Sequence, residues 1–115
     1  MGIILAINSN KPDKITKNLI SQHFPGNNFI SIIGSREGIP NKPDPYSANE
    51  IVKLMGLNKD EVLYVGDSES DIKTAKNAGL KSVGCLWGFR DIEVLTEAQT
   101  DIIIKEPKEL LNYLK

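Results

Sequence analysis

The ten residues Val62–Asp71, with the sequence VLYVGDSESD, decide the expected fold of this chain. The run begins with four apolar or aromatic residues and a glycine, which is typical of a short strand buried in a parallel sheet. Asp67 and Asp71 follow, four residues apart. The next residues are typical of a helix that starts near Ser70 and stops at Gly79. We therefore expect a strand, a tight turn and a helix, with Asp67 just beyond the carboxyl end of the strand.

Asp67 and Asp71 are candidate metal ligands because of this placement. Open α/β sheets bind their ligands at the carboxyl ends of the strands. Two carboxylates that face one point suit a hard cation such as Mg²⁺. In the alternative interpretation, Asp67 and Ser68 serve only as turn and helix-cap residues. The strand, turn and helix pattern leaves both interpretations open.

The rest of the chain repeats this alternation of strand and helix. The alternation predicts an α/β fold with right-handed crossovers between parallel strands. The expected architecture is a three-layer, Rossmann-like one, with a parallel sheet in the middle and helices on both of its faces. A chain of 115 residues is one domain at most, so we treat 1–115 as a single domain. The expected strands are Ile3–Ile7, Phe29–Ile33, Val62–Val65, Lys81–Leu86 and Ile102–Ile104, and the expected helices are Pro12–His23, Tyr46–Met55, Ser70–Ala78, Asp91–Ala98 and Pro107–Leu114.

Composition excludes several classes of protein. Lys and Arg number 14 against 15 Asp and Glu, so the chain lacks the basic excess of a dedicated nucleic-acid binder. The single cysteine, Cys85, allows no internal disulfide. No apolar run reaches the roughly 18 residues of a membrane span, and the start lacks the basic lead of a signal peptide. We expect a cytoplasmic protein without a nucleic-acid or membrane partner.

Two further loops carry candidate binding residues. Ser9 and Asn10 follow the first expected strand, where a hydroxyl and free backbone N–H groups at a helix start suit a small anion; a plain N-cap is the alternative. Lys42 lies among prolines that are expected to hold the loop stiffly extended, which would fix its positive charge in place. An ordinary exposed lysine is the alternative. A hydroxyl, a cation and two acids together suit a phosphate group bridged by Mg²⁺.

These motifs, taken together, resemble the haloacid dehalogenase-like hydrolase superfamily, and most closely its phosphoglycolate phosphatase branch. The resemblance covers about residues 3–114. It is carried by Ser9-Asn10-Lys11, Lys42-Pro43-Asp44-Pro45, Gly66-Asp67-Ser68-Glu69-Ser70-Asp71 with Ala75 and Ala78-Gly79, and Trp87-Gly88-Phe89-Arg90.

The resemblance implies a Mg²⁺-dependent phosphatase that acts on a small phosphorylated metabolite. Ser9 and Lys42 would be catalytic residues that bind the phosphate, and Lys42 would also orient the nucleophile. Asn10 would add its backbone N–H to the phosphate site. Asp67 would be a Mg²⁺ ligand, and Asp71 would be the second acid that supports the metal.

One departure from the family pattern affects the expected activity. The family's first motif is Asp-x-Asp-x-Thr at the end of a central strand, and its first Asp is the nucleophile. No such segment occurs in this sequence. The chain therefore resembles the carboxyl-terminal portion of such an enzyme, lacking the central first strand and the cap, and we expect it to be inactive alone. The alternative is a catalytically inactive phosphate- or metal-binding half-domain that pairs with another chain.

The departure also makes a structural prediction. In the family, the missing strand lies between the strands that match Ile3–Ile7 and Val62–Val65. Without it, two buried strand edges lose their hydrogen-bond partners, and such edges invite pairing. We expect one of three outcomes: the two strands close up, a partner chain or a second copy supplies a strand, or the gap stays open.

Overall fold

The structure is a computed structural model that describes residues 3–26, 28–88 and 91–114. Of the motifs quoted above, Phe89 and Arg90 lie outside the described residues. No helix in the described ranges is long and apolar enough to span a membrane. The elements are β1 (Leu5–Pro12), α1 (Asp13–His23), β2 (Phe29–Ser35), α2 (Tyr46–Met55), the 3-10 helix η1 (Lys59–Glu61), β3 (Leu63–Gly66), α3 (Glu69–Ala78), β4 (Lys81–Cys85), α4 (Ile92–Glu97), β5 (Ile102–Ile104) and the 3-10 helix η2 (Pro107–Tyr113).

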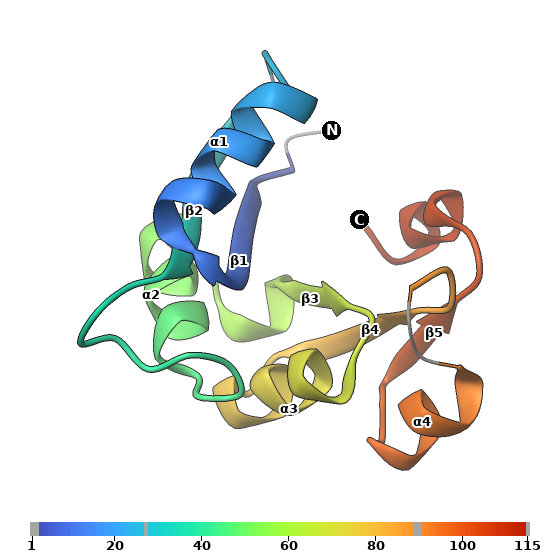
Figure 1. The fold of residues 1–115 in the computed structure, drawn as a ribbon. Coiled ribbons are helices and arrows are strands. Elements are labelled where there is room, and N and C mark those ends of the chain that lie inside the picture. The colour runs from blue at the N-terminus through green and yellow to red at the C-terminus, as the bar shows by residue number, and fades with distance from the viewer. Residues whose placement is uncertain (1–2, 27, 89–90, 115) are drawn as a thin grey trace.

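The strands form two parallel sheets rather than one continuous sheet (Figure 1). One sheet pairs β1 with β2, and the other has the order β3-β4-β5. The break lies between β1 and β3, where the sequence predicts a missing strand. The expectation that the two strands close up is wrong, because β1 and β3 are not hydrogen-bonded neighbours and the gap between them is open in this single chain. That another chain supplies a strand stays a prediction.

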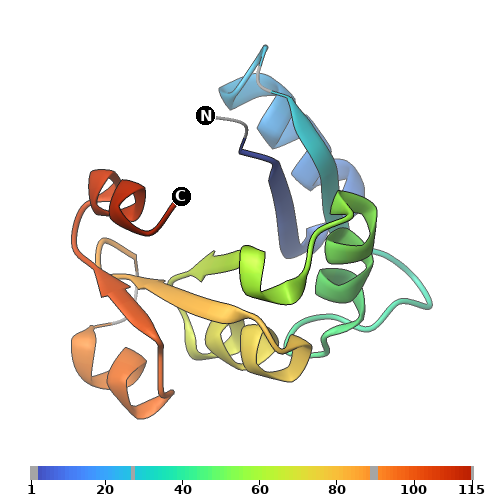
Figure 2. The same ribbon diagram turned by 180° about the vertical axis from the view of Figure 1, so that it is seen from behind.

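Helices cover both faces, which confirms the three-layer α/β prediction. Figures 1 and 2 show α1 and α2 on opposite faces of the β1-β2 sheet. In the second sheet, Tyr64 faces α2 and α3 and packs on their buried cluster with Val62. Leu63, the neighbour of Tyr64 in β3, packs on the other face with Val83 and with Leu110 of η2. The two faces of β3 therefore contribute to two separate parts of the core.

The structure corrects several local expectations. The N-cap of α3 is Ser68, whose Oγ accepts a hydrogen bond from Asp71 N, so the helix starts earlier than the prediction based on Ser70. Helical periodicity places Leu54 of α2 inward beside Ile51, but Leu54 is 58% exposed, and Val52 takes the buried position. Trp87, for which the sequence favours core packing over the mouth of a pocket, is half exposed. These differences arise because packing, and not the local pattern, decides which residues are covered.

Helix α1 and the final helix also differ from the prediction. Helical periodicity places Ile15 and Phe24 on one apolar face that should be buried, but each is about half exposed. Thr16 is buried instead, since its hydroxyl donates to Lys11 O and Pro12 O. The final segment begins at Pro107 as expected, but it forms a 3-10 helix.

Candidate active site

A bulge at the end of β1 presents Ser9 and Asn10. The strand advances four residues from Asn8 to Pro12, while β2 advances two residues, from Ile33 to Ser35. The extra residues leave the regular ladder, as in a β-bulge. Within the bulge, Ser9 Oγ accepts a hydrogen bond from Lys11 N at 3.1 Å. The expected strand end at Ile7 is therefore wrong, since the strand continues past the bulge to Pro12.

The side chain of Asn10 holds the loop that carries Lys42. Asn10 Oδ1 accepts from Lys42 N at 2.9 Å, and Asn10 Nδ2 donates to Lys42 O at 3.4 Å. From the other side, Asn77 Nδ2 on α3 donates to Pro43 O at 2.9 Å. The side-chain amide of Asn10 therefore holds Lys42, and that of Asn77 holds the next residue of the loop, Pro43. Sequence analysis missed both contacts, which join residues 32 and 34 positions apart.

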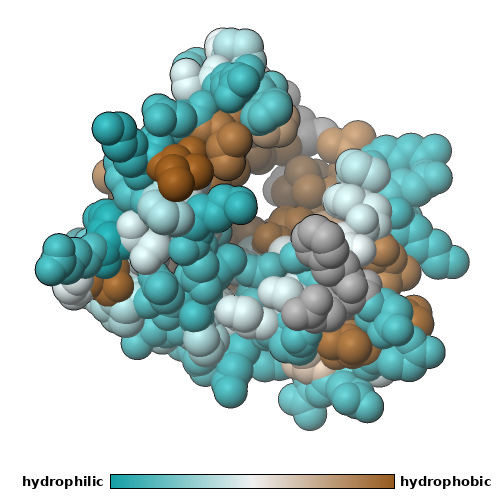
Figure 3. All heavy atoms as spheres, in the orientation of Figure 1, coloured by the Kyte–Doolittle hydropathy of each residue, from teal (hydrophilic) through white to brown (hydrophobic). Residues whose placement is uncertain are grey.

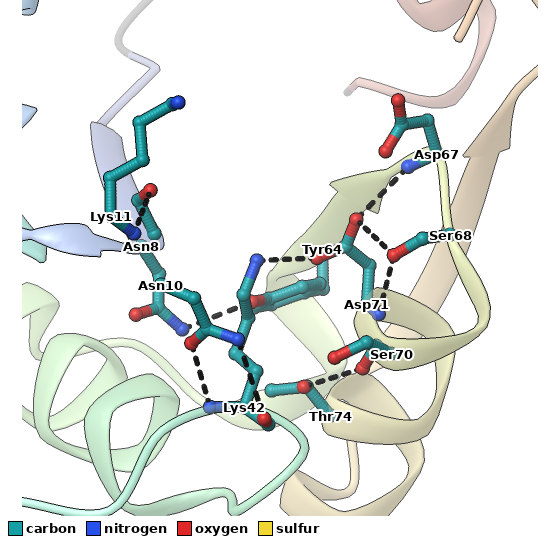
Figure 4. Close-up of polar contacts among 11 residues, drawn as sticks. Asn8, Asn10, Lys11, Lys42, Tyr64, Asp67, Ser68, Ser70, Asp71 and Thr74 are labelled. Carbon is teal, nitrogen blue, oxygen red and sulfur yellow. Dashed lines mark hydrogen bonds and ion pairs between the residues drawn. The ribbon is translucent and has the colours of Figure 1, made fainter. Parts of the chain in front are cut away.

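The Lys42 loop turns, and the expectation of an extended backbone is wrong. Asp44 N donates to Asn41 O at 2.9 Å, which closes a tight turn, and the Lys42–Pro43 peptide bond is cis. Prolines restrict the backbone, but they are common in tight turns as well as in extended segments. The turn directs Lys42 toward the carboxyl end of β3 (Figure 4).

Lys42 forms a largely buried ion pair with Asp71. The Nζ to Oδ1 distance is 2.7 Å, and the side chains are 15% and 11% exposed. The other carboxylate oxygen of Asp71, Oδ2, accepts from Asp67 N and Ser68 Oγ, both at 3.1 Å. Both oxygens of Asp71 are therefore already hydrogen-bonded by the protein, as Figure 4 shows.

Asp67 is placed differently from Asp71. Its carboxylate points away from the hydrogen-bond network in Figure 4 and accepts no hydrogen bond from a described residue. Two glycines make room for the acids: a Cβ on Gly66 would overlap the side chain of Asp71, and a Cβ on Gly88 would overlap that of Asp67. Asp67 thus has the oxygens that are free to bind an added group.

The donor set fits Mg²⁺ that keeps several of its waters. Among the described residues, no group of three or more His, Cys, Asp or Glu could hold a metal. Mg²⁺ commonly binds proteins through one or two carboxylates together with substrate phosphate and water. Asp67 would bind such an ion directly. Asp71 would hold Asp67 in position, because its Oδ2 accepts a hydrogen bond from Asp67 N.

A second polar link joins the two sheets below Lys42. Asn8 Nδ2 on β1 donates to the hydroxyl of Tyr64 on β3 at 3.0 Å. Burial raises the pKa of Tyr64 above its ordinary value, and the negative charge of Asp71 raises it further. The hydroxyl therefore stays neutral at physiological pH. This link ties β1 to β3 on the face covered by α2 and α3.

We expect Tyr64→Phe to lower the free energy of unfolding by about 1 kcal/mol, because the half-buried Asn8 amide loses its acceptor. Urea unfolding followed by circular dichroism measures the change. Tyr46→Phe is the matched control, since Tyr46 is 44% exposed and should change stability little. Equal effects of the two substitutions would show that the Asn8 link does not stabilise the fold.

The structure brings the predicted site residues together at one edge of the two sheets. Asn10, Lys42 and Asp71 are joined by hydrogen bonds, and Asp67 and Ser68 bond to the same Asp71 carboxylate. Ser9 lies next to Asn10 in the bulge, and its hydroxyl bonds only to Lys11 N among the described residues. A parallel α/β fold of this kind defines a Rossmann-like domain, and such domains bind their ligands at the carboxyl ends of the strands, where the lysine and the two acids lie.

The comparisons with known proteins agree with this class. The sequence model of the haloacid dehalogenase-like hydrolase family matches residues 1–85, so the chain belongs to that family. The phosphoglycolate phosphatase of Vibrio cholerae is 37% identical over 111 residues, which are 96% of this chain and 49% of that protein. The phosphoglycolate phosphatase of Aliivibrio fischeri is 34% identical over 98% of this chain and 50% of its own length. The chain spans about half the length of these curated relatives.

Solved structures show the same fold. A chain from Lactobacillus delbrueckii subsp. bulgaricus, provisionally assigned as a phosphoglycolate phosphatase, superposes with a TM-score of 0.91 at 35% identity, over 98% of this chain and 47% of that chain. A predicted phosphoglycolate phosphatase from Haemophilus somnus superposes with a TM-score of 0.87 at 28% identity, over 97% of this chain and 50% of that chain. Nearly all of this chain thus matches about half of each longer chain.

Proposed function

We propose that this chain supplies the phosphate- and metal-binding part of a Mg²⁺-dependent phosphatase that hydrolyses a small phosphomonoester. The observation that supports this most is the Lys42–Asp71 ion pair of 2.7 Å beside the free carboxylate of Asp67. Lys42 is a fixed cation, and the Asp67 carboxylate could hold Mg²⁺ beside it, so a phosphate group between them would be neutralised by positive charge from two sides. Phosphoglycolate is the substrate class to test first, because the curated relatives named above are phosphoglycolate phosphatases.

Each residue would have a defined role in binding the phosphate. An ammonium group has three N–H donors, so Lys42 can bond to Asp71 and still donate to phosphate oxygens. Ser9 would donate its hydroxyl to the same phosphate from the bulge of β1. Asn10 and Asn77 are positioning residues, because they hold the backbone of the Lys42 loop. Mg²⁺ bound at Asp67 would neutralise phosphate charge and polarise the ester.

The nucleophile of the reaction is proposed to lie outside this chain. The 115 residues contain no Asp-x-Asp-x-Thr segment, and the oxygens of Asp71 are held by Lys42, Ser68 and the Asp67 backbone. The complete site would break the ester P–O bond, release the alcohol with a proton, and take the oxygen for inorganic phosphate from water. The same observation favours a second candidate, an inactive half-domain that binds phosphate or metal and pairs with another chain.

Metal binding tests the part of the proposal that both candidates share. We expect Asp67→Asn to weaken Mg²⁺ binding, measured by titration calorimetry in the presence of inorganic phosphate, by more than about tenfold. Asp60→Asn, in exposed η1, is the matched control and should bind as the unaltered chain does. If both variants kept full affinity, Asp67 would not be the metal ligand.

Turnover of p-nitrophenyl phosphate separates the two candidates. The purified chain with Mg²⁺ should show no release of phosphate above the level of Asp67→Asn, because a group that forms a covalent intermediate contributes almost all activity. Clear turnover that Asp67→Asn abolishes would contradict the proposal of a nucleophile outside the chain. Turnover that appears only on addition of the missing segment would establish the phosphatase and exclude the inactive half-domain.

A further inference from the structure

The loop that follows β4 packs against the side chain of Asp67. β3 and β4 are parallel neighbours, and Gly66 at the end of β3 lies opposite Gly84 near the end of β4. The segments that follow two such strands leave the sheet at the same edge. Asp67 follows β3 directly, and Gly88 lies three residues past the end of β4. A Cβ on Gly88 would overlap Cβ, Cγ and Oδ2 of Asp67, so the backbone of this loop lies directly against the acid.

Hydrogen bonds among the described residues do not fix the direction of the Asp67 side chain. The bond to Asp71 Oδ2 is donated by the backbone N of Asp67, and the Asp67 carboxylate points away from the network in Figure 4. An aspartate without such bonds can adopt any of three staggered χ1 rotamers. The direction of this carboxylate therefore depends on packing.

The packing around Asp67 is one-sided. On the side toward β1, Figure 3 shows that the molecule is hollowed between its two halves, and Val65 of β3 lines this hollow with Leu5 of β1. The hollow has a volume of about 710 Å³. On the other side β3 pairs with β4, and the loop that contains Gly88 follows β4. Among the described residues, Gly88 is thus the close neighbour that limits where the Asp67 side chain can lie.

Both backbones at this contact are anchored. Leu86 N donates to Ile104 O at 3.0 Å, which continues the pairing of β4 with β5 into the loop. Asp67 N is held by Asp71 Oδ2. A methyl group at position 88 would overlap the Cβ of Asp67, which rotation about χ1 cannot move. The φ angle of Gly88 lies outside the left-handed region and the residue is exposed, so the requirement for glycine comes from the contact with Asp67.

We propose that Gly88 is a positioning residue for Asp67, because its bare backbone holds the Asp67 side chain in one rotamer beside the Lys42–Asp71 pair. The inference rests on the proposed function, in which Asp67 binds Mg²⁺. Gly88 touches neither the metal nor the phosphate and acts through Asp67. When the binding-competent position of a ligand is populated one tenth of the time, its apparent affinity falls tenfold. A carboxylate fixed in advance avoids this loss.

Mg²⁺ binding by the full 115-residue chain tests the inference, measured by titration calorimetry with inorganic phosphate present. Gly88→Ala should weaken binding by at least about tenfold, because it displaces Asp67 from the competent position. Gly84→Ala is the matched control, since its new methyl group meets the side chains of Leu95 and Thr100 instead of an acid. The control should bind Mg²⁺ as the unaltered chain does, and circular dichroism checks that both variants fold.

A measurement without metal reads the direction of Asp67 itself. Three-bond NMR couplings to the β protons of Asp67 give the populations of its χ1 rotamers. We expect one rotamer in the unaltered chain and in Gly84→Ala, and a different or mixed population in Gly88→Ala. A loop with a general structural role would change stability without changing this rotamer.

Thermal unfolding of paired variants keeps the inference testable if Gly88→Ala folds poorly. Gly88→Ala should lower the Tm of the unaltered chain by at least about 5 °C. Asp67→Gly removes all three atoms that the new methyl group overlaps, so in that background Gly88→Ala should lower the Tm by less than about 2 °C. Equal Tm shifts in the two backgrounds would show that the cost arises elsewhere and would overturn the inference.

The remaining outcomes separate the inference from the proposed function. Mixed Asp67 rotamers in the unaltered chain, or full Mg²⁺ affinity of Gly88→Ala while Asp67→Asn loses it, would overturn the inference and leave the proposed metal ligand supported. Absence of Mg²⁺ binding to the unaltered chain, with an Asp67 rotamer that still changes in Gly88→Ala, would overturn the proposed metal site and support the steric role of Gly88.

Discussion

We expect Lys42→Met to lower the free energy of unfolding by about 3 kcal/mol. The substitution removes the ammonium group that pairs with the largely buried carboxylate of Asp71. Asp71 keeps the hydrogen bonds from Asp67 N and Ser68 Oγ, so the acid is not left entirely without partners. Among the described residues, the ion pair of Asp71 is with Lys42. Urea unfolding monitored by circular dichroism gives the change directly.

A double-mutant cycle isolates the ion pair from the packing of the lysine. Asp71→Asn removes the charge that Lys42 neutralises, so Lys42→Met should cost less in that background. We expect a coupling energy of about 1–3 kcal/mol, as for other residues that share one network. Lys53→Met, at an exposed position of α2, controls for the loss of a lysine and should change stability by less than about 0.5 kcal/mol. A coupling energy near zero would show that the pair does not stabilise the fold.

The convergence of Lys42, Asp67 and Asp71 was predictable from the sequence. Lys42 and Asp67 lie in loops that follow expected strands, and Asp71 lies in the first turn of the next helix. Parallel strands bring their carboxyl ends to one edge of the sheet. This placement of the three residues follows from the alternation of strands and helices alone, and the apolar runs of the sequence indicate where the strands lie. The family resemblance then indicated the same residues, and the open gap between β1 and β3 follows from the strand that the motif pattern lacks.

The contacts that hold the site were not predictable in the same way. Asn10 clasps Lys42 and Asn77 holds Pro43 across more than 30 residues of sequence. An asparagine in a loop or on a helix surface carries no local signal of such a partner. The exposure of Leu54 has a similar origin, because helical periodicity allows several neighbouring apolar residues to face inward. Only the packing of α2 decides that Val52 is buried and Leu54 is not.

The turn between β3 and α3 requires a residue without a side chain at position 66, which is Gly66. A Cβ on this residue would overlap Cβ, Cγ and Oδ2 of Asp71. The φ angle of Gly66 is not in the left-handed region, so the requirement for glycine is steric and not conformational. Because Asp71 is also held by Lys42 and by its own helix, it cannot move aside cheaply.

Gly66→Ala should therefore destabilise the fold by at least about 2 kcal/mol, as overpacking against a fixed neighbour does. It should also speed hydrogen exchange of the Asp67 amide, which donates to Asp71 Oδ2. Gly84→Ala is the matched control, because Gly84 pairs with Gly66 in the next strand. Its Cβ would meet Leu95 Cδ1 at 3.0 Å and Thr100 Cγ2 at 3.1 Å, and these are the ends of side chains. If Gly66→Ala cost no more than Gly84→Ala and left the Asp67 amide protected, Asp71 would be free to move, and the site would not depend on this close approach.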